Sequence, residues 1–533
     1  MDSKFTYNFS TTPATEILKT FAQQPIDLTN PKVITAERVE KFLAEDLGFQ
    51  VSYATERVTE DVLSALEALA FEAGVFEKMA KMQAGEVINC IEGYPSENRA
   101  VLHTAVRDFF DEPQTAKPAQ EAASLAKEQV HKLAKFLEPL NREQRFHDLL
   151  VIGIGGSELG PKALYQALEY LANSQRKVHF AGNVDPDGLH LILKNLDLKH
   201  TLVCVVSKSG TTLETTVNEE FAKSYFVNLG LKPEEHFIAI TGEGSPMDNP
   251  NRYLECFYIW DWIGGRYSGS SIIGGVILSF AYGIDVYLEF LRGAHDMDKA
   301  ALKKKPLQNL PLLVALLGIW NHNFLNIETL AIIPYSQALA RFPAHLQQLD
   351  MESNGKQIDK LGHFVNYVTG PILWGEPGTN AQHSFFQLIH QGKSPIALEF
   401  IGFKESQTKH DFSYQGTTSQ EKLLSNLFAQ AIALAQGQNS DNPNKQFLGN
   451  RPSHLILAKE LDPYRLGALL SLYEHKTAFQ GFIWNINSFD QEGVQLGKVL
   501  ANRIIDQFAN NDKKREAQYP IGQAYIQIIK EKL

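Results

Sequence analysis

The spacing of apolar residues separates a helical first part of the chain from a later part in which strands and helices alternate. Between residues 30 and 89, apolar positions recur at helical spacing with acidic residues on the opposite face. One such stripe consists of Val58, Val62, Leu66 and Leu69. Residues 113–144 are polar and rich in Ala, Lys, Glu and Gln, which favours another helix. We therefore expect the first part of the chain to be helical.

Short apolar runs that lead into Gly, Ser or Thr loops and then into helical stretches occur in two sets. The first set, between residues 149 and 242, is LLVIG, TLVCVVS and HFIAITG. The second follows a long helical stretch at about 272–317 and is LAIIPYS (330–336), FVNYVTGPILWG (364–375), PIALEFIGF (395–403) and SHLILAKEL (453–461). This alternation is typical of βαβ units. It predicts an α/β protein with two doubly wound domains, each a mainly parallel sheet flanked by helices.

These patterns predict four segments along the chain. Residues 1–110 form a helical segment that packs on the larger domain, 111–285 the first, smaller domain, 286–505 the second domain, and 506–533 a C-terminal arm. The turn-rich stretch 437–450 is expected to be an exposed loop, and KKREAQ (513–518) a solvated helix surface.

Composition narrows the functional class. The 533 residues are 44% hydrophobic and 21% charged, as in ordinary globular enzymes, and the formal charge of -11 argues against a nucleic-acid partner. Cys90, Cys204 and Cys256 have no metal-binding or redox spacing. The N-terminus lacks an apolar signal region, and the longest apolar run, 310–320, is too short to span a bilayer. We expect a cytoplasmic protein without a membrane segment.

The first candidate site is the glycine-rich turn after the strand at about 149–153. The turn ends in Gly156 and Ser157 and leads into a helix, so its backbone amides suit an anion. The dinucleotide fingerprint fails because its third glycine position is Glu158, and the P-loop fails because Pro161 stands where lysine is needed. A phosphate site and a turn that only packs the helix on the sheet both remain open.

The second candidate is the loop after TLVCVV, which places four hydroxyls and one ammonium before a helix. These residues are Ser207, Lys208, Ser209, Thr211 and Thr212. Hydroxyls, backbone amides and a helix N-terminus suit a phosphate monoester without a bound metal, which points to a sugar phosphate. The alternative is an ordinary helix cap in which Thr211 or Thr212 holds the first amides.

Two further residues suit carbonyl chemistry. Arg266 follows two glycines, where a fixed guanidinium could stabilise an oxyanion or simply pair with Asp261. Glu352 lies in a helix-ending or turn context before Asn354 and Gly355. A glutamate in a partly desolvated site is a suitable base for a proton beside a carbonyl, as enediol chemistry requires, although a lone glutamate is more often a surface charge.

His383 and Lys498 are candidates for proton exchange with a bound sugar. We expect His383 in the first turn of a helix that Asn380 caps and Gly392 ends, where the positive helix end favours a neutral imidazole. A lone histidine there is more often structural, and no neighbouring ligands indicate a metal site. Lys498 lies beside an apolar helix stripe, where it either reaches a cleft or is solvated.

Six segments occur in the order that is found in the glucose-6-phosphate isomerase family, and together they make the chain resemble that family over essentially its whole length. They are VIGIGGSELGPKA, VSKSGTTLET, WDWIGGRYSGSSIIG, LDMESNGK, GEPGTNAQHSFFQLIHQG and FDQEGVQLGK, with ENRAVLHTAVR (97–107) before them. The resemblance implies two sugar-isomerase (SIS) domains with a C-terminal arm. It also implies interconversion of glucose 6-phosphate and fructose 6-phosphate in glycolysis and gluconeogenesis, without a metal or organic cofactor, by a cytoplasmic homodimer.

The resemblance also implies roles for individual residues. The phosphate cradle is Gly156, Ser157, Ser207, Lys208, Ser209 and Thr212, and Gln348 and Gln491 contact the substrate. Glu352 moves a proton between C2 and C1 through a cis-enediolate that Arg266 stabilises. His383, contributed by the other subunit, and Lys498 open the sugar ring. The chain departs from the family pattern at Glu492 and Gln495, which flank Lys498 without replacing it.

Three rival functions agree less well with the sequence. An amino-sugar phosphate isomerase or a bifunctional glucose/mannose phosphate isomerase would share the fold, but chain length and the last two motifs favour the long glucose type. A non-catalytic sugar-phosphate binder that regulates a partner has no need of Arg266, Glu352, His383 and Lys498. A nicotinamide-dependent dehydrogenase lacks its glycine fingerprint.

Overall fold

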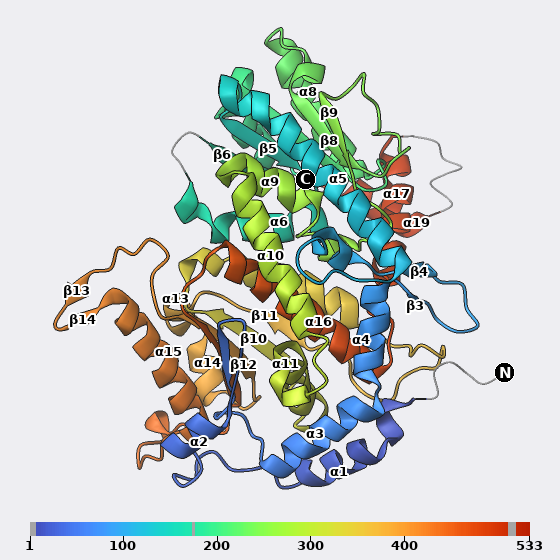
Figure 1. Cartoon of the computed structure of the whole chain (residues 1–533). Helices are drawn as coiled ribbons and strands as arrows, with labels where there is room; N and C mark the ends of the chain where they lie inside the picture. Colours follow the sequence, from blue (N-terminus) through green and yellow to red (C-terminus); the bar gives the residue numbers. More distant parts are fainter. Residues whose placement is uncertain (1–6, 173–175, 510–518, 533) are drawn as a thin grey trace. The chain divides into compact units, whose positions relative to one another are not determined.

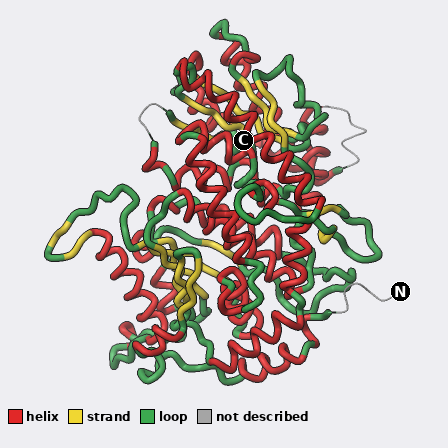
Figure 2. The backbone as a smooth tube through the Cα atoms, viewed as in Figure 1, coloured by secondary structure: helices red, strands yellow, loops and turns green. Residues whose placement is uncertain are grey.

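Two mainly parallel β-sheets organise residues up to Ser488 in the computed structural model, which describes residues 7–172, 176–509 and 519–532 (Figure 1). The strands of these two sheets form two separate yellow groups in Figure 2, each with helices packed around it. The prediction of an α/β fold with two mainly parallel sheets is confirmed.

The first sheet has the strand order β6-β5-β7-β8-β9, and all its neighbouring strands are parallel. Its strands are β5 (Asp148–Ile152), β6 (Lys177–Ala181), β7 (Thr201–Ser207), β8 (Phe237–Thr241) and β9 (Glu255–Tyr258). The chain enters at β5, moves outward to β6 and then returns to the other side of β5. The order therefore reverses between β5 and β7, and open parallel sheets bind ligands at the carboxyl ends of such a pair of strands.

Helices cover both faces of this sheet. Leu149 and Val151 of β5 face one core with helices α5 (Lys117–Glu143), α6 (Leu159–Ala167) and α9 (Ile272–Tyr282). Leu150 and Ile152 face the other core with α7 (Pro186–Lys194) and α8 (Leu213–Asn228). Burial on both faces explains why β5 is apolar at consecutive positions rather than alternating ones.

The second sheet has the order β1-β2-β15-β12-β10-β11. Its four parallel strands are β10 (Thr329–Pro334), β11 (Ile372–Trp374), β12 (Ala397–Phe403) and β15 (Ser453–Ala458). The run 364–375 therefore contains a strand only in its last part. Helix α16 (Pro463–Trp484) packs against α10 (Ile284–Ala300) and α11 (Leu310–Ile319) and is buried along most of its length.

The N-terminal segment departs from the helical expectation. A hairpin of β1 (Leu43–Asp46) and β2 (Phe49–Ser52) adds two antiparallel strands to the second sheet, with β2 beside β15. Leu47 and Gly48 both have positive φ, which fits the right-handed twist of a two-residue hairpin turn. Phe49 and Val51 are buried, so period-two burial replaces the helical period here.

The remaining elements complete the first unit. The N-terminal helices are α1 (Pro13–Ala22), α2 (Ala36–Lys41), α3 (Glu60–Glu72) and α4 (Val75–Ala84). Around the second sheet lie α12 (Phe342–Gln347), α13 (Gly378–Gln382), α14 (Phe386–Gln391) and α15 (Ser419–Gln436). Two short antiparallel pairs are β3 (Val87–Asn89) with β4 (Arg99–Ala100) and β13 (Ser413–Tyr414) with β14 (Thr417–Thr418).

A second unit begins at Phe489 and contains α17 (Gln495–Ala509) and α19 (Pro520–Lys532). Within this unit the Gln507 side chain donates a hydrogen bond to the Tyr519 carbonyl. The predicted solvated run KKREAQ lies outside the described residues, and the predicted segment boundaries at 110, 285 and 505 stay predictions. None of the described helices has the length and apolar character that crossing a bilayer requires.

Candidate active site

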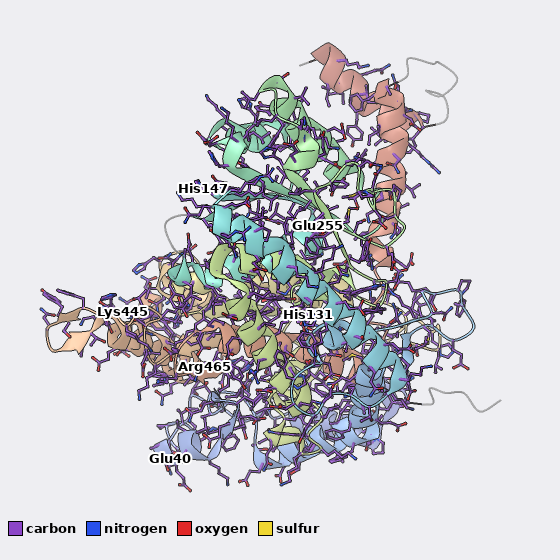
Figure 3. The ribbon with its side chains drawn as sticks, turned by 45° about the horizontal axis from the view of Figure 1, so that its top comes forward. Glu40, His131, His147, Glu255, Lys445 and Arg465 are labelled. Carbon is purple, nitrogen blue, oxygen red and sulfur yellow. The ribbon has the colours of Figure 1, made fainter. Side chains whose placement is uncertain are left out.

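The loops that follow β5 and β7 lie side by side at the carboxyl ends of these paired strands, where the strand order reverses. His147, labelled in Figure 3, precedes β5 and marks the opposite, amino end of the sheet. Gly153 is packed closely here, because a Cβ at this position would lie 3.2 Å from the Cβ of Val206. The two loops that the sequence singled out are thus neighbours in the fold.

The loop after β7 is held by its own hydroxyl groups. Ser207 Oγ and Thr212 Oγ1 lie 2.9 Å apart, and the Thr211 hydroxyl donates to Ser209 Oγ at 3.0 Å. Thr212 occupies the N-cap position of α8, but its side chain does not cap the helix amides there. The plain helix-cap interpretation therefore fails at Thr212, and the N-terminus of α8 presents its amides beside two hydroxyl-bearing residues.

Lys208 adds a cation to this loop. Its ammonium donates to the Ile263 carbonyl at 3.0 Å and lies 3.9 Å from the Asp261 carboxylate. Burial, assisted by the positive charge of Arg99, lowers the pKa of Lys208 to about 8, although Asp261 opposes the shift. A dianionic phosphate at this loop would favour the charged ammonium.

The turn after β5 lies directly against the turn that carries Arg266. A Cβ at Gly156 would lie 2.1 Å from the carbonyl oxygen of Gly265, so only glycine fits this backbone contact. The Ser268 hydroxyl also donates to the Gly156 carbonyl at 3.3 Å. Gly156 therefore holds the glycine turn against the turn of Arg266, and Ser157 is the next residue along the chain.

Arg266 is almost fully buried, with 1% of its side chain exposed, and its guanidinium contacts Ser353, Ser488 and Glu352. Nε donates to Ser353 Oγ at 2.6 Å, and one terminal nitrogen donates to the Ser488 carbonyl at 2.7 Å. The other terminal nitrogen lies 3.6 Å from Glu352 Oε1. Asp261, the other partner that the sequence offered for Arg266, instead lies 3.9 Å from the Lys208 ammonium, with 89% of its side chain exposed.

Glu352 ends a π-helical turn, Gln348–Glu352, that directly continues α12. Such turns inside helices frequently occur at functional sites. The Glu352 side chain is 19% exposed, so its carboxylate is within reach of a ligand while it faces a buried guanidinium. Gln348, at the start of the same turn, has its amide nitrogen 3.3 Å from the position of a Gly155 Cβ. The structure therefore brings Gln348 next to the glycine turn, and Glu352 next to Arg266.

His383 is placed differently from the expectation. Helix α13 begins at Gly378 and contains Asn380, so Asn380 is no cap, and His383 follows the carboxyl end of this short helix. The single helix predicted here is two short helices, α13 and α14, and only its predicted end at Gly392 is confirmed. The helix-end argument for a neutral imidazole therefore fails. The His383 residue is exposed, and no described hydrogen bond or ion pair joins its side chain to Arg266 or Glu352.

Comparison with known proteins decides the family. The model of the phosphoglucose isomerase family matches residues 52–520 of the chain. The chain belongs to this family. It is 59% identical to a glucose-6-phosphate isomerase of Protochlamydia amoebophila over 98% of this chain and 96% of that protein. It is 53% identical to the enzyme of the same name from Chlamydia caviae over 95% and 96%, respectively. The crystal structure of a glucose-6-phosphate isomerase from Chlamydia trachomatis superposes with a TM-score of 0.94 at 47% identity, over 97% of this chain and all of that one.

Two of the predicted site residues, Gln491 and Lys498, belong to the C-terminal unit. The prediction that Lys498 lies on a helix is confirmed, because it lies on α17, where it is exposed. Glu492 and Gln495 belong to the 3-10 turn and the helix start just before it. The roles of Gln491 and Lys498 stay predictions.

Two buried hydroxyl residues beside Arg266, Ser353 and Tyr267, were not predicted as site residues from the sequence. Ser353 is fully buried, and its Oγ accepts the Arg266 bond and lies 3.0 Å from the Tyr267 hydroxyl. Their positions directly after Glu352 and Arg266 were a usable signal, because a polar residue beside a buried charge is a natural partner for it. Across the described residues, no cluster of three or more His, Cys, Asp or Glu side chains suits a metal ion.

Proposed function

We propose that this protein interconverts glucose 6-phosphate and fructose 6-phosphate by ring opening and a cis-enediolate intermediate. The observation that carries the proposal is the buried Arg266 guanidinium 3.6 Å from the partly exposed Glu352 carboxylate. This pair lies beside a glycine turn and a hydroxyl-rich loop that suit a phosphate. Membership of the phosphoglucose isomerase family supports the same reaction.

The phosphate end of the sugar binds to the two loops after β5 and β7. The cradle is Gly156, Ser157, Ser207, Lys208, Ser209 and Thr212. Hydroxyl groups, helix amides and the Lys208 ammonium complement a dianion without a metal. Binding energy from this end, which does not react, positions C1 and C2 at Glu352 and thereby lowers the barrier of the chemical step.

Glu352 is the base of the isomerisation. Its carboxylate takes the proton from C2 of the open-chain aldose, and the C–H electron pair forms the C1–C2 double bond of the enediolate. The carboxylate then returns the proton to C1, while the hydroxyl proton moves from O2 to O1 and C2 becomes the carbonyl of the ketose. Arg266 stabilises the enediolate oxygen and cannot compete for the proton, because a guanidinium stays charged in proteins. One residue therefore supplies a fixed charge, and the other carries the proton.

His383 and Lys498 open the sugar ring, and Gln348 and Gln491 contact the substrate. His383 reaches the active site of a second subunit, so the working form is a homodimer. The enzyme acts in the cytoplasm and uses no cofactor, membrane or nucleic acid. The exposure of His383 in one chain supports this arrangement. Leu388 and Ile372 of the same part of the fold are 57% and 58% exposed, as apolar residues of an interface are in a single subunit.

A coupled assay tests the reaction. The protein is given fructose 6-phosphate, glucose-6-phosphate dehydrogenase and NADP in the presence of a chelator. NADPH formation that depends on the protein is expected, and Glu352→Gln should abolish it while calorimetric binding of 6-phosphogluconate persists. Saturable binding of fructose 6-phosphate without turnover by the parent protein would instead indicate a regulatory sugar-phosphate binder. Equal turnover by Glu352→Gln would refute the choice of base.

A mixing experiment tests the shared site. Glu352→Gln and His383→Ala, each expected to be inactive alone, are unfolded and refolded together in equal amounts. If His383 acts across the dimer, each mixed dimer contains one site with both substitutions and one intact site. Random pairing then restores about a quarter of the parent activity. If both residues act from the same chain, every site carries a substitution and the mixture stays inactive.

A further inference from the structure

The guanidinium of Arg266 is oriented by contacts on its Nε edge and on one terminal nitrogen. Ser353 Oγ accepts from Nε at 2.6 Å, and the Ser488 carbonyl accepts from a terminal nitrogen at 2.7 Å. A guanidinium is a rigid plane, so fixing two of its nitrogens fixes the direction of the third. That third nitrogen is the one that lies 3.6 Å from Glu352.

Each of these two acceptors is itself held. The Ser488 hydroxyl donates to Asn354 Oδ1 at 2.7 Å, which anchors the residue whose carbonyl Arg266 uses. Ser353 Oγ lies 3.0 Å from the hydroxyl of Tyr267. Because a guanidinium can only donate, Ser353 Oγ accepts the hydrogen bond from Arg266. The hydrogen bond between the Ser353 and Tyr267 hydroxyls then fixes the orientation of the Ser353 hydroxyl group.

Tyr267 is well placed to orient Ser353, because its own ring is locked. The ring is 1% exposed and packs on the His103 ring with centroids 4.6 Å apart. Burial raises the pKa of Tyr267 to about 12, so it keeps its hydroxyl hydrogen at neutral pH. His103 Nε2 in turn lies 4.0 Å from Glu474, which forms a buried ion pair with Arg107 at 2.7 Å. A rigid core cluster thus supports the contact.

We propose that Ser353 and Tyr267 are positioning residues that hold the Arg266 guanidinium in the plane where it faces Glu352 and the reacting carbons. Neither hydroxyl is assigned a contact with the substrate. The proposal rests on the proposed isomerase function, and it requires that loss of either hydroxyl lowers turnover without weakening capture of the phosphate end of the sugar.

Tyr267→Phe tests the proposal, because it keeps the ring and its packing and removes only the hydroxyl. We expect kcat for fructose 6-phosphate to fall about threefold to tenfold, the range of one lost hydrogen bond, with KM changed less than about twofold. Ser353→Ala should lower kcat at least as much. The matched control is Tyr287→Phe, since Tyr287 is equally buried and donates to the carbonyls of Ser270 and Ser271 at 3.0 and 3.2 Å.

The control should keep kcat within about twofold of the parent while losing a buried hydroxyl of the same kind. A double-mutant cycle adds a second readout. If Tyr267 acts through Ser353, adding Tyr267→Phe to Ser353→Ala should cause little further loss of kcat. The proposal would be overturned if the double variant lost kcat by the product of the two single losses. Equal kcat values for Tyr267→Phe and Tyr287→Phe, or a rise in KM at constant kcat, would also overturn it. An inactive parent protein would instead refute the isomerase function.

Discussion

The contact between Gly156 and Gly265 gives the sharpest prediction, because it joins the glycine turn after β5 to the turn that carries Arg266. In Gly156→Ala, the new Cβ would lie 2.1 Å from the Gly265 carbonyl oxygen, 2.3 Å from its carbonyl carbon and 2.9 Å from the Arg266 nitrogen. All three neighbours are backbone atoms, so no side chain can turn away to make room.

The size of the effect follows from this geometry. Real Cβ atoms essentially never come closer than 3.0 Å to such atoms, so opening the 2.1 Å contact requires a displacement of about 0.9 Å. Overpacking of this kind costs about 1–3 kcal/mol of stability. A shift of about 1 Å in a group that acts on the reacting atoms costs roughly a hundredfold in rate. We therefore expect Gly156→Ala to lower kcat/KM for fructose 6-phosphate about a hundredfold.

The measurement is the coupled assay together with thermal unfolding of both proteins. Gly269→Ala is the matched control, because Gly269 is buried in the same stretch but its Cβ would make only ordinary contacts, at 3.5 Å to Leu164 and 3.6 Å to Leu470. It should change kcat/KM less than about threefold. If Gly156→Ala is as active as Gly269→Ala, the two turns are not in rigid contact and the placement of Arg266 does not depend on Gly156.

Two further predictions concern pH. Because burial and Arg99 lower the pKa of Lys208 to about 8, its charge is lost as pH rises through that value. Inhibition by 6-phosphogluconate should therefore weaken above pH 8, and Lys208→Met should bind more weakly and lack this change; a parallel profile in the variant would refute the assignment. His345 is completely buried, which lowers its pKa from 6.5 to about 4. The unfolded chain takes up this proton below about pH 6.5 and the folded chain does not, so acid favours unfolding. The parent should lose about 3 kcal/mol between pH 6.5 and 4 that His345→Leu does not lose, as measured by urea unfolding, and equal losses would count against it.

Central strands of both sheets were predictable because burial on two faces leaves a recognisable mark. β5, β7, β8, β10, β12 and β15 begin close to the predicted runs, each a continuous apolar stretch followed by a loop. In these two sheets, the sequence missed the edge strands β6, β9 and β1, together with β2, which pairs with β1 in the hairpin. Their residues are of mixed polarity because one side of an edge strand has no neighbouring strand and fewer covering side chains.

The candidate site divides in the same way into local and long-range features. The hydroxyl-rich loop after β7 and the glycine turn after β5 are local, so the residue types alone indicated an anion site. The partners of Arg266 are not local, since Ser353 and Ser488 lie far along the chain and meet it only through packing. The prediction placed His383 in the first turn of a helix, but α13 begins at Gly378 after the N-cap Pro377, so His383 follows its last residue.

The unequal burial of Arg266 and Glu352 explains how one pair of charges can serve two tasks. Arg266 is almost fully enclosed, and an enclosed charge acts more strongly on a neighbouring negative charge because little water screens it. Its desolvation is compensated by Ser353, Ser488 and Glu352, so the guanidinium is already oriented before a substrate arrives. Glu352 keeps 19% of its side chain exposed, which a base that must meet a C–H bond requires. A site with both charges buried would lose access for the proton, and one with both exposed would lose the electrostatic effect.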